Sequence, residues 1–254
     1  MDYISLNLQL HFSQIPAQTK GMKVIHSDNL TFVDSGLPCD TFNVIHIRNA
    51  ATLQEDELKK AIEHFRNQQS AFCIWISDED CTDQVSDFFS KMDIQHQAEE
   101  TGMILDLASY KFTSNSLHKQ ITIVDDLKKL TDYAKVIAEN WSPPDQHVIQ
   151  YYQLTADGYL NPENQVVLLV FYLDGQPVSS VELFPTDEET IGLYGFATLE
   201  AFRGQGIGSA LMTYSLNLAK EKGYKRAILQ ASEDGIGIYK RMGFKVINTY
   251  FEYA

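Results

Sequence analysis

Three glycines within five residues give the segment from Arg203 to Gly208 the plainest chemical potential in this sequence. The segment reads Arg-Gly-Gln-Gly-Ile-Gly, follows a strand-like stretch at 191–198 and precedes an amphipathic helix. Glycine has no Cβ, so a ligand can approach the main-chain N–H groups of such a segment closely. The start of a helix adds unpaired N–H groups and the positive end of the helix dipole. The segment therefore predicts a binding site for a phosphate or pyrophosphate.

The spacing of these glycines argues against two common phosphate-binding loops. A dinucleotide-binding fingerprint requires a third glycine where this chain has Ser209. A P-loop requires a lysine before its Ser or Thr, and no lysine occurs from residue 203 to residue 219. The remaining pattern is Arg-x-x-Gly-x-Gly, for which a glycine-rich turn at an ordinary helix start is the alternative explanation.

A second segment, 229–244, adds a further motif about thirty residues later. It reads as a strand, a short helix carrying Tyr239, and Gly243-Phe244 leading into a last strand. In this order and spacing, the two segments resemble the GNAT acyltransferases (the Gcn5-related N-acetyltransferase superfamily). The resemblance implies a mixed-sheet α/β GNAT fold in the C-terminal half, the activity of an N-acetyltransferase, and acetyl-CoA as the acyl donor.

The resemblance also implies roles for individual residues. The pyrophosphate of acetyl-CoA would lie on the main chain of the glycine-rich segment, and its pantetheine arm would run beside the preceding strand. Ser232 stands where many family members carry an Asn that faces the pantetheine arm, and Tyr239 stands at the position of the general acid. A phenol of pKa about 10 would serve the departing thiol, of pKa about 8.5, as a hydrogen-bond donor rather than by full proton transfer. A packed aromatic ring is the alternative for Tyr239. The implied cofactor-binding residues are Phe196, Ala197, Thr198, Arg203, Gly204, Gln205, Gly206, Ile207, Gly208 and Ser232.

Acyl transfer to an amine also requires the amine to lose its proton. An alkylamine has a pKa near 10.4, so forming the neutral amine at pH 7 costs roughly 4–5 kcal/mol. A general base is expected to carry that proton away. Glu182 is the preferred candidate because a carboxylate within the apolar strand Val-Ser-Ser-Val-Glu-Leu-Phe can be half-buried, with a side chain that points to solvent as the alternative. His147 and the acidic turn at 187–189 are the other candidates, with surface roles as their alternatives.

Hydrophobic periodicity independently predicts the order of elements in the C-terminal half. Asp125 or Asp126 caps a helix whose apolar positions continue to Trp141, and two prolines at 143–144 stop it. Asp174-Gly175-Gln176 is a tight turn between two strands. The expected elements are a helix with Leu127, Leu130, Ala134, Ile137 and Trp141 on one face, a helix at 145–154, strands at 165–173, 177–184 and 191–198, a helix with Ile207, Ala210, Leu211, Tyr214 and Leu218 on one face, a strand at 226–230, the short helix of Tyr239, and a strand at 244–253.

The N-terminal half is also predicted to be mixed α/β, but it has no glycine-rich segment. Thr52 and Glu55 have the spacing of a capping box before a helix, and further elements are expected near 71–76, 85–92 and 103–107. In segments such as 35–43 (Ser-Gly-Leu-Pro-Cys-Asp-Thr-Phe-Asn) and 102–107 (Gly-Met-Ile-Leu-Asp-Leu), this half resembles the degenerate GNAT-like domain that precedes some catalytic GNAT domains. The predicted organisation is a degenerate GNAT-like domain at 1–108, a polar linker at 109–120, and a catalytic GNAT domain at 121–254.

Composition narrows the class of partner. The net charge of −14 argues against nucleic acid and against anionic membranes. From Arg203 onward, however, eight Lys and Arg face four Asp and Glu, a local balance that suits an anionic cofactor. Three cysteines and seven scattered histidines lack metal-ligand spacing, so no metal is expected, and free thiols favour a cytoplasmic location.

Two functional classes remain open from the sequence. The favoured one is an N-acyltransferase that acetylates a primary amine of a small molecule or a peptide by direct attack. The alternative is a noncatalytic acyl-CoA-binding sensor that retains the fold. The N-terminal half is expected to shape the acceptor cleft or to form a homodimer contact.

Overall fold

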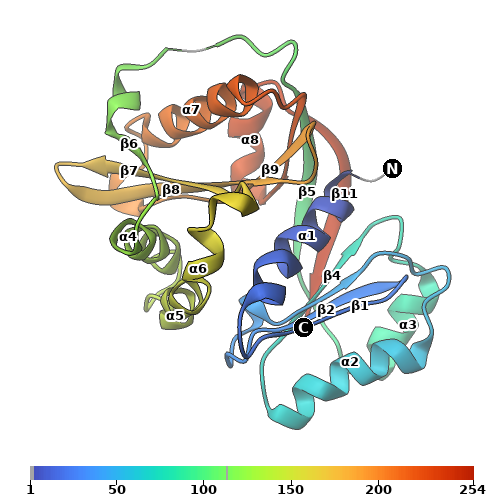
Figure 1. Cartoon of the computed structure of the whole chain (residues 1–254). Coiled ribbons are helices and arrows are strands. Elements are labelled where there is room, and N and C mark those ends of the chain that lie inside the picture. The colour runs from blue at the N-terminus through green and yellow to red at the C-terminus, as the bar shows by residue number, and fades with distance from the viewer. Residues whose placement is uncertain (1–2, 113) are drawn as a thin grey trace. The chain divides into compact units, whose positions relative to one another are not determined.

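The computed structural model of the chain describes residues 3–112 and 114–254, which fall into two compact units (Figure 1). Unit 1 comprises the described residues up to Met103 together with 230–236 and 246–254. Unit 2 comprises residues 104–229 and 237–245. Each unit contains its own helices and strands, and the two are described separately below.

Unit 1 is a mixed sheet with helices on both faces. Its strands lie in the order β1-β2-β3-β4-β11-β5. Figure 1 shows α1 against one face of the sheet and α2 with α3 against the other. The elements are α1 (Tyr3–Gln18), β1 (Lys23–His26), β2 (Leu30–Asp34), η1 (Asp40–Phe42), β3 (Val44–Ile47), α2 (Glu55–Gln68), β4 (Cys73–Ser77), α3 (Asp83–Lys91), β5 (His96–Asp106) and β11 (Lys245–Tyr253).

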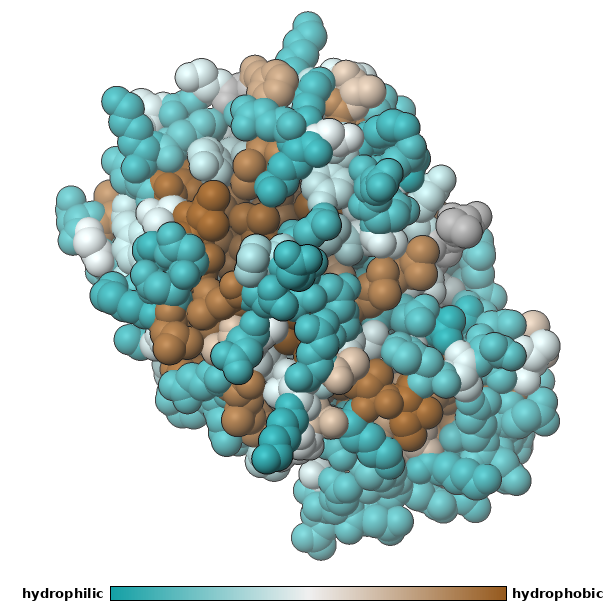
Figure 2. Space-filling view, in the orientation of Figure 1, coloured by the Kyte–Doolittle hydropathy of each residue, from teal (hydrophilic) through white to brown (hydrophobic). Residues whose placement is uncertain are grey.

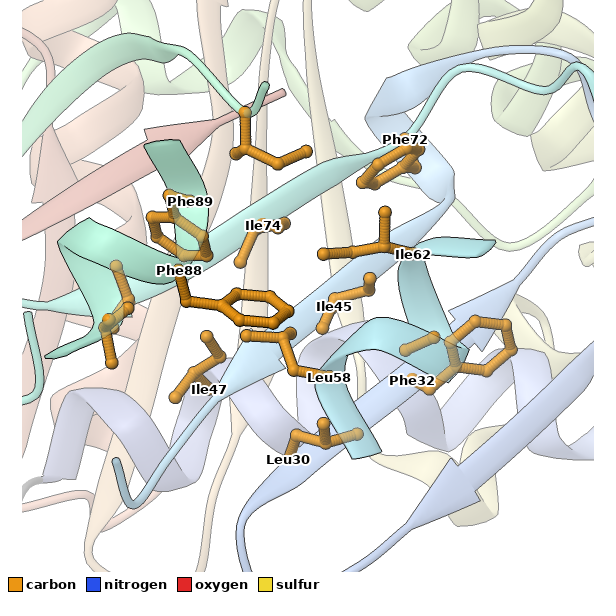
Figure 3. Packing of buried hydrophobic residues seen from close by; sticks show 14 of the residues in the cluster. Leu30, Phe32, Ile45, Ile47, Leu58, Ile62, Phe72, Ile74, Phe88 and Phe89 are labelled. Atoms are coloured by element: carbon orange, nitrogen blue, oxygen red, sulfur yellow. The ribbon is translucent and has the colours of Figure 1, made fainter. Parts of the chain in front are cut away.

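The largest core of unit 1 lies between α2, α3 and the sheet. Helix α2 buries one stripe of side chains at three- and four-residue spacing, as an amphipathic helix does. The side chains of α2 and α3 cover this face of β3 and β4. Figure 3 shows this packing: Leu58 and Ile62 of α2 and Phe89 of α3 lie over Ile45 and Ile74 of the strands.

Unit 2 has the same kind of architecture. Its strands lie in the order β10-β9-β8-β7-β6, with α4 and α5 on one face and α7 on the other (Figure 1). Helix α8 begins in residues of unit 1 and ends in residues of unit 2. The elements are η2 (Ser116–Gln120), β6 (Ile121–Ile123), α4 (Leu127–Ala138), α5 (Gln146–Leu154), α6 (Ala156–Tyr159), η3 (Pro162–Asn164), β7 (Val167–Leu173), β8 (Gln176–Pro185), β9 (Thr190–Thr198), η4 (Glu200–Phe202), α7 (Ile207–Glu221), β10 (Arg226–Ala231) and α8 (Glu233–Arg241).

The two units repeat one connection pattern. In unit 1, β1, β2 and β3 pair antiparallel, and α2 then leads to β4, which is parallel to β3. In unit 2, β7, β8 and β9 pair antiparallel, and α7 then leads to β10, which is parallel to β9. The mixed α/β class predicted for both halves is therefore confirmed, and α2 corresponds in position to α7.

Strand β11 comes from the far end of the sequence but completes the sheet of unit 1. It lies between β4 and β5, and its residues Tyr250 to Tyr253 pair antiparallel with Ser77 to Ile74 of β4. Unit 1 is thus assembled from segments separated by about 140 residues of sequence. The sequence limits 1–108, 109–120 and 121–254 stay a prediction.

Three details of the predicted helices are wrong. The capping box at Thr52 does not form, because the Thr52 hydroxyl donates to Asn29 Oδ1 at 2.6 Å and Gln54 takes the N-cap position. Helix α4 is capped by Asp126 as expected and ends at Ala138. Its expected apolar stripe is too long, since Leu127 is 64% exposed and Trp141, beyond the helix, is 43% exposed.

The third difference is a rotation of the apolar stripe of α7. Tyr214 and Leu218 are only half-buried, while Met212, Leu216 and Ala219 are fully buried. Ile207, Ala210 and Leu211 are buried as expected, so the first turn of the helix follows the predicted stripe.

Candidate functional site

The glycine-rich segment forms the turn that opens α7. Gly206 is the N-cap residue, and Gly204 and Gly206 have φ angles of 75° and 79°, in the left-handed region that favours glycine. The first helical hydrogen bond runs from the N–H of Ala210 to the carbonyl of Gly206 at 2.9 Å. The N–H groups of residues 207–209 therefore precede the helix ladder and are available to a ligand.

The space over this turn is open. A Cβ built on Gly204 or on Gly206 would meet no atom within 4 Å. A Cβ on Gly208, by contrast, would lie 3.1 Å from Thr198 Oγ1 and 3.2 Å from Phe196 Cζ. The three glycines thus serve two purposes. The first two shape an open anion cradle, and Gly208 lets α7 pack closely on β9.

The side chains of the segment are held in place by main-chain oxygens. Arg203 Nε donates to the carbonyl of Thr198 at 2.9 Å, and Gln205 Nε2 donates to the carbonyl of Ala201 at 3.4 Å. The guanidinium is therefore tied to the end of β9, beside the cradle.

Strand β9 diverges from its parallel neighbour before it reaches the cradle. The β9–β10 ladder pairs Thr190, Ile191 and Gly192 with residues 226–228. Beyond Gly192, no further β9–β10 pair occurs in the described parts of the chain. Residues 195–198 of β9 therefore have no β10 partner in this ladder, and the Thr198 carbonyl is instead bonded by Arg203. Phe196, Ala197 and Thr198 all lie on this stretch, where a ligand could pair with the strand main chain.

A bulge in β9 puts Tyr194 and Phe196, two residues apart, on opposite faces of the sheet. The register with β8 shifts between Ser180, opposite Ala197, and Glu182, opposite Tyr194. Ser180 Oγ donates to the carbonyl of Gly195 inside the bulge at 2.9 Å. Tyr194 therefore shares the α4 face with Glu182, whereas Phe196 contacts Gly208 on the α7 face.

Tyr239 lies beside this strand. Its ring centroid is 6.1 Å from that of Phe196 and 5.8 Å from that of Phe244, and the residue is 7% exposed. The structure thus brings Tyr239 next to the stretch of β9 that has no β10 partner, and its role as general acid stays a prediction. A Cβ on Gly237, two residues earlier, would meet only the end of the Arg241 side chain at 3.5 Å, so this side of α8 is open.

Ser232 starts α8 through its main chain. Its carbonyl accepts from the N–H of Gly235 at 2.9 Å and of Ile236 at 3.2 Å, and the residue is exposed. The structure assigns Ser232 to the helix start. Its implied contact with the pantetheine arm stays a prediction.

Glu182 is 1% exposed, more deeply buried than the half-buried position expected from the sequence. It lies on the α4 face of β8 among tyrosines of three helices: Tyr133 of α4, Tyr152 of α5 and Tyr159 of α6. Burial raises the pKa of each of these phenols well above its usual value, and the charge of Glu182 raises it further. The rings of Tyr133 and Tyr152 are 5.2 Å apart, and those of Tyr152 and Tyr159 are 5.0 Å apart.

We name these three tyrosines together with Glu182 the tyrosine–glutamate cluster. Its tyrosines are not predicted from the sequence, because they come from separate helices. Only the adjacent pair Tyr151-Tyr152, in a helix preceding an apolar strand that carries a glutamate, hints at it. Tyr133 also lies against the bulge, since a Cβ on Gly195 would come within 2.3 Å of its hydroxyl.

The other candidate bases have structural partners. Asp187 Oδ1 accepts from the N–H groups of Glu189 and Thr190 at 2.8 and 2.7 Å, which shapes the turn. Glu189 pairs with Lys225 and Arg226, and its bond to Lys225 chiefly lowers the pKa of Glu189. His147 pairs with Asp145, the N-cap of α5, at 3.0 Å. The 187–189 turn and His147 are therefore parts of local caps and ion pairs.

The comparisons with known proteins agree with this geometry. Residues 128–244 match the profile of the Acetyltransferase (GNAT) family. These residues form a GNAT-family acetyltransferase domain. Within the described residues, the chain has no helix long and apolar enough to cross a membrane, and no group of three His, Cys, Asp or Glu side chains suited to a metal ion.

Solved structures share the fold over both units. A GCN5-related N-acetyltransferase from Kribbella flavida is similar with a TM-score of 0.68 at 14% identity, covering 100% of this chain and 96% of that chain. A tandem GNAT protein from the clavulanic acid biosynthesis pathway is similar with a TM-score of 0.61 at 10% identity, covering 99% and 94%. A conserved protein of unknown function from Staphylococcus epidermidis is similar with a TM-score of 0.63 at 19% identity, covering 92% and 93%. The similarity to a tandem GNAT protein over nearly the whole chain supports two GNAT-like units in this protein.

Proposed function

We propose that this GNAT enzyme transfers the acetyl group of acetyl-CoA to a primary amine. One observation carries the proposal: the open cradle at residues 204–209 follows a stretch of β9 that has no β10 partner, and Tyr239 lies beside that stretch. A phosphate site, a strand edge and a phenol in this order match an elongated donor with a pyrophosphate, a peptide-like arm and a thioester.

The residues present suit such a donor. The N–H groups of residues 207–209 and the start of α7 would hold the pyrophosphate, and Arg203 would add charge at the rim. The main chain of Phe196, Ala197 and Thr198 would lie along the amides of the arm, because β10 does not pair with this stretch of β9. Acetyl-CoA would supply the activated acetyl thioester.

The proposed role of Tyr239 is to donate a hydrogen bond from its hydroxyl to the sulfur that leaves. Phe196 and Phe244 hold the ring from two sides, which restricts its motion. A hydrogen bond suits the relative pKa values of phenol and thiol better than full proton transfer, which would be uphill by roughly 2 kcal/mol.

We assign the base role to Glu182. The tyrosine–glutamate cluster places hydroxyl groups around its buried carboxylate, and such groups can relay a proton from a bound amine toward Glu182. The carboxylate and Tyr194 lie directly opposite each other on the same face, so β8 and β9 fix its position relative to the β9 bulge.

The acceptor is proposed only by class. A primary amine of a small molecule or a peptide fits the chemistry, and a net charge of −14 favours a cationic one. The same charge disfavours nucleic acid as a partner, and we propose a cytoplasmic location from the free cysteines.

A thiol-release assay with acetyl-CoA and a panel of amines tests the proposal, with a thermal shift by coenzyme A as the binding readout. We expect release that depends on both substrates and a rise in melting temperature with coenzyme A alone. A thermal shift without turnover on any amine would instead favour the noncatalytic acyl-CoA sensor. Absence of the shift would contradict the proposed donor site.

A further inference from the structure

Unit 1 contains a cavity of about 460 Å³ between α2 and the strands β1 and β2. Its floor is apolar and consists of Ile25, Leu30, Phe32 and Ala61. Its rim carries Lys23 and Lys60. Cavities of roughly 300–1,000 Å³ with apolar walls and few polar groups are typical of small-molecule sites. In Figure 2, hydrophobic surface framed by hydrophilic side chains is visible over this β1–β2 region.

The corresponding space in unit 2 is filled by the protein itself. There α7 faces β7 and β8, and Leu117 of η2 packs onto the apolar cluster formed by Phe171, Val178 and Ile207. Unit 1 repeats the same strands and helix but has no described segment in the place of η2. Ile25 on the cavity floor consequently remains 46% exposed. The fold therefore covers this apolar surface in one unit and leaves it accessible in the other.

Among the described residues, two lysines at the rim have no carboxylate partner and can meet an anion. Lys23 Nζ lies 5.8 Å from the centroid of the Phe32 ring, and neither Lys23 nor Lys60 forms an ion pair in the described parts of the chain. Asp34, opposite Lys23 in the ladder, is bound by His64 Nε2 at 2.7 Å and by the N–H of Gly36 at 2.8 Å.

The two acidic residues on the rim have other interactions. Glu57 accepts from Asn29 Nδ2 at 3.1 Å. Asp56 lies in the first turn of α2, where the helix dipole stabilises a carboxylate. The two lysines are the groups of the rim that can pair with a carboxylate.

We propose that this cavity binds a small amphipathic anion, an apolar chain or ring that carries one carboxylate. The apolar part lies on Ile25, Phe32 and Ala61, and the carboxylate meets the ammonium groups of Lys23 and Lys60. The site belongs to unit 1 and is independent of the acetyl-CoA cradle.

Calorimetric titration of the full chain, saturated with coenzyme A, tests the site with three probes of equal chain length: octanoate, octanol and octyltrimethylammonium. We expect octanoate to bind most tightly and octyltrimethylammonium most weakly. The double substitution Lys23→Gln and Lys60→Gln weakens octanoate about tenfold, the effect of losing a charge-assisted hydrogen bond, and leaves octanol unchanged. Ile25→Glu abolishes binding of both.

The matched control is Lys59→Gln with Lys91→Gln, which removes the same charge from α2 and α3. Lys59 pairs with Glu63 and does not line the cavity. This control should bind octanoate as the unchanged protein does. Three outcomes overturn the proposal: no octanoate binding, equal or tighter binding of the quaternary ammonium probe, or octanoate binding that survives both the lysine pair and Ile25→Glu. The lysine pair is exposed, so it keeps the test valid even where Ile25→Glu fails to fold.

Discussion

The ring of Tyr239 lies 6.1 Å from the ring of Phe196, with an angle of 55° between the ring planes. This contact joins α8 to β9 within unit 2, at the part of β9 that has no β10 partner. Phe196 in turn lies against Gly208 at the start of α7. The phenol, the stretch of β9 without a β10 partner and the anion cradle are therefore connected by direct packing. The activity should depend on each of them.

Removing the phenol hydroxyl should impair catalysis and spare binding. We expect Tyr239→Phe to lower kcat roughly 100-fold, since a preorganised hydrogen bond to charge that develops in the transition state contributes at least that much in many enzymes. The KM for acetyl-CoA should hardly change, because the ring and its contacts remain. Initial rates of thiol release measure both values. Tyr214→Phe, on α7, is the matched control, and a Tyr239→Phe enzyme with unchanged kcat would remove the proposed role.

A side chain on Gly206 should obstruct the cradle. Gly206→Val is expected to raise the KM for acetyl-CoA about tenfold or more, because its Cβ projects into the open space over the N–H groups. The left-handed backbone adds a stability cost of roughly 1–2 kcal/mol.

Gly175→Val separates these two effects. Gly175 has a φ of 82° in the β7–β8 turn, and a Cβ added to it would also meet no atom within 4 Å. The Gly175→Val variant should lose a similar free energy of unfolding in urea and keep the KM for acetyl-CoA of the unchanged enzyme. Equal changes in KM for the two variants would mean that backbone strain, and not the cradle, determines binding.

Neutralising the buried carboxylate should slow the reaction without unfolding the protein. Glu182→Gln keeps the shape of the side chain, so the rings around it can stay packed. We expect kcat/KM to fall roughly 100-fold. The acidic limb of the plot of kcat/KM against pH should also change shape, because that limb reports protonation of the base. Glu188→Gln, in the exposed turn, is the control. A Glu182→Gln profile that matches that of the unchanged enzyme would assign the base elsewhere.

Unit 1 should lose stability as the pH rises toward neutrality. Burial, and next the charge of Glu252, raise the pKa of Glu100 from 4.5 to about 7. The folded state therefore holds this proton more tightly than the unfolded state does. The free energy of unfolding should fall by up to about 3 kcal/mol as the pH rises from about 4.5 to about 7.

Urea unfolding at pH 5 and pH 8 measures this dependence. Glu100→Gln should be more stable than the unchanged protein at pH 8 and should show a flatter dependence on pH. Some dependence should remain, because burial also raises the pKa of Glu252. Glu99→Gln, on the neighbouring exposed position, should behave as the unchanged protein. A pH dependence identical in both variants would exclude Glu100 as its source.

The sequence predicts unit 2 well because its signals are local. The hairpin turn at Asp174-Gly175, the cap at Asp126 and the glycines of the α7 turn each depend on neighbouring residues. The capping box at Thr52 fails for the opposite reason: its hydroxyl finds a partner in Asn29, 23 residues earlier in the chain.

Two other features lie beyond sequence patterns. Helix α1 buries Asn7 and Ser13 alongside Ile4 and Leu8, so its stripe does not read as apolar and the sequence does not predict the helix. The surroundings of Glu182 come from three helices brought together only by folding, and no spacing in the sequence encodes that meeting. The glycine-rich segment shows where the donor would lie, whereas the tyrosine–glutamate cluster emerges from the structure.

The position of β11 between β4 and β5 affects the order of events during synthesis. Domains usually fold in the order in which they leave the ribosome, at about 5–20 residues per second. Unit 1 lacks one strand until residues 246–254 emerge, so β4 keeps an unpaired edge for roughly ten seconds or more at that rate. Such an edge is a template for pairing with another chain. The first unit to be translated is therefore the last to be completed, and we expect its nascent form to need protection by chaperones.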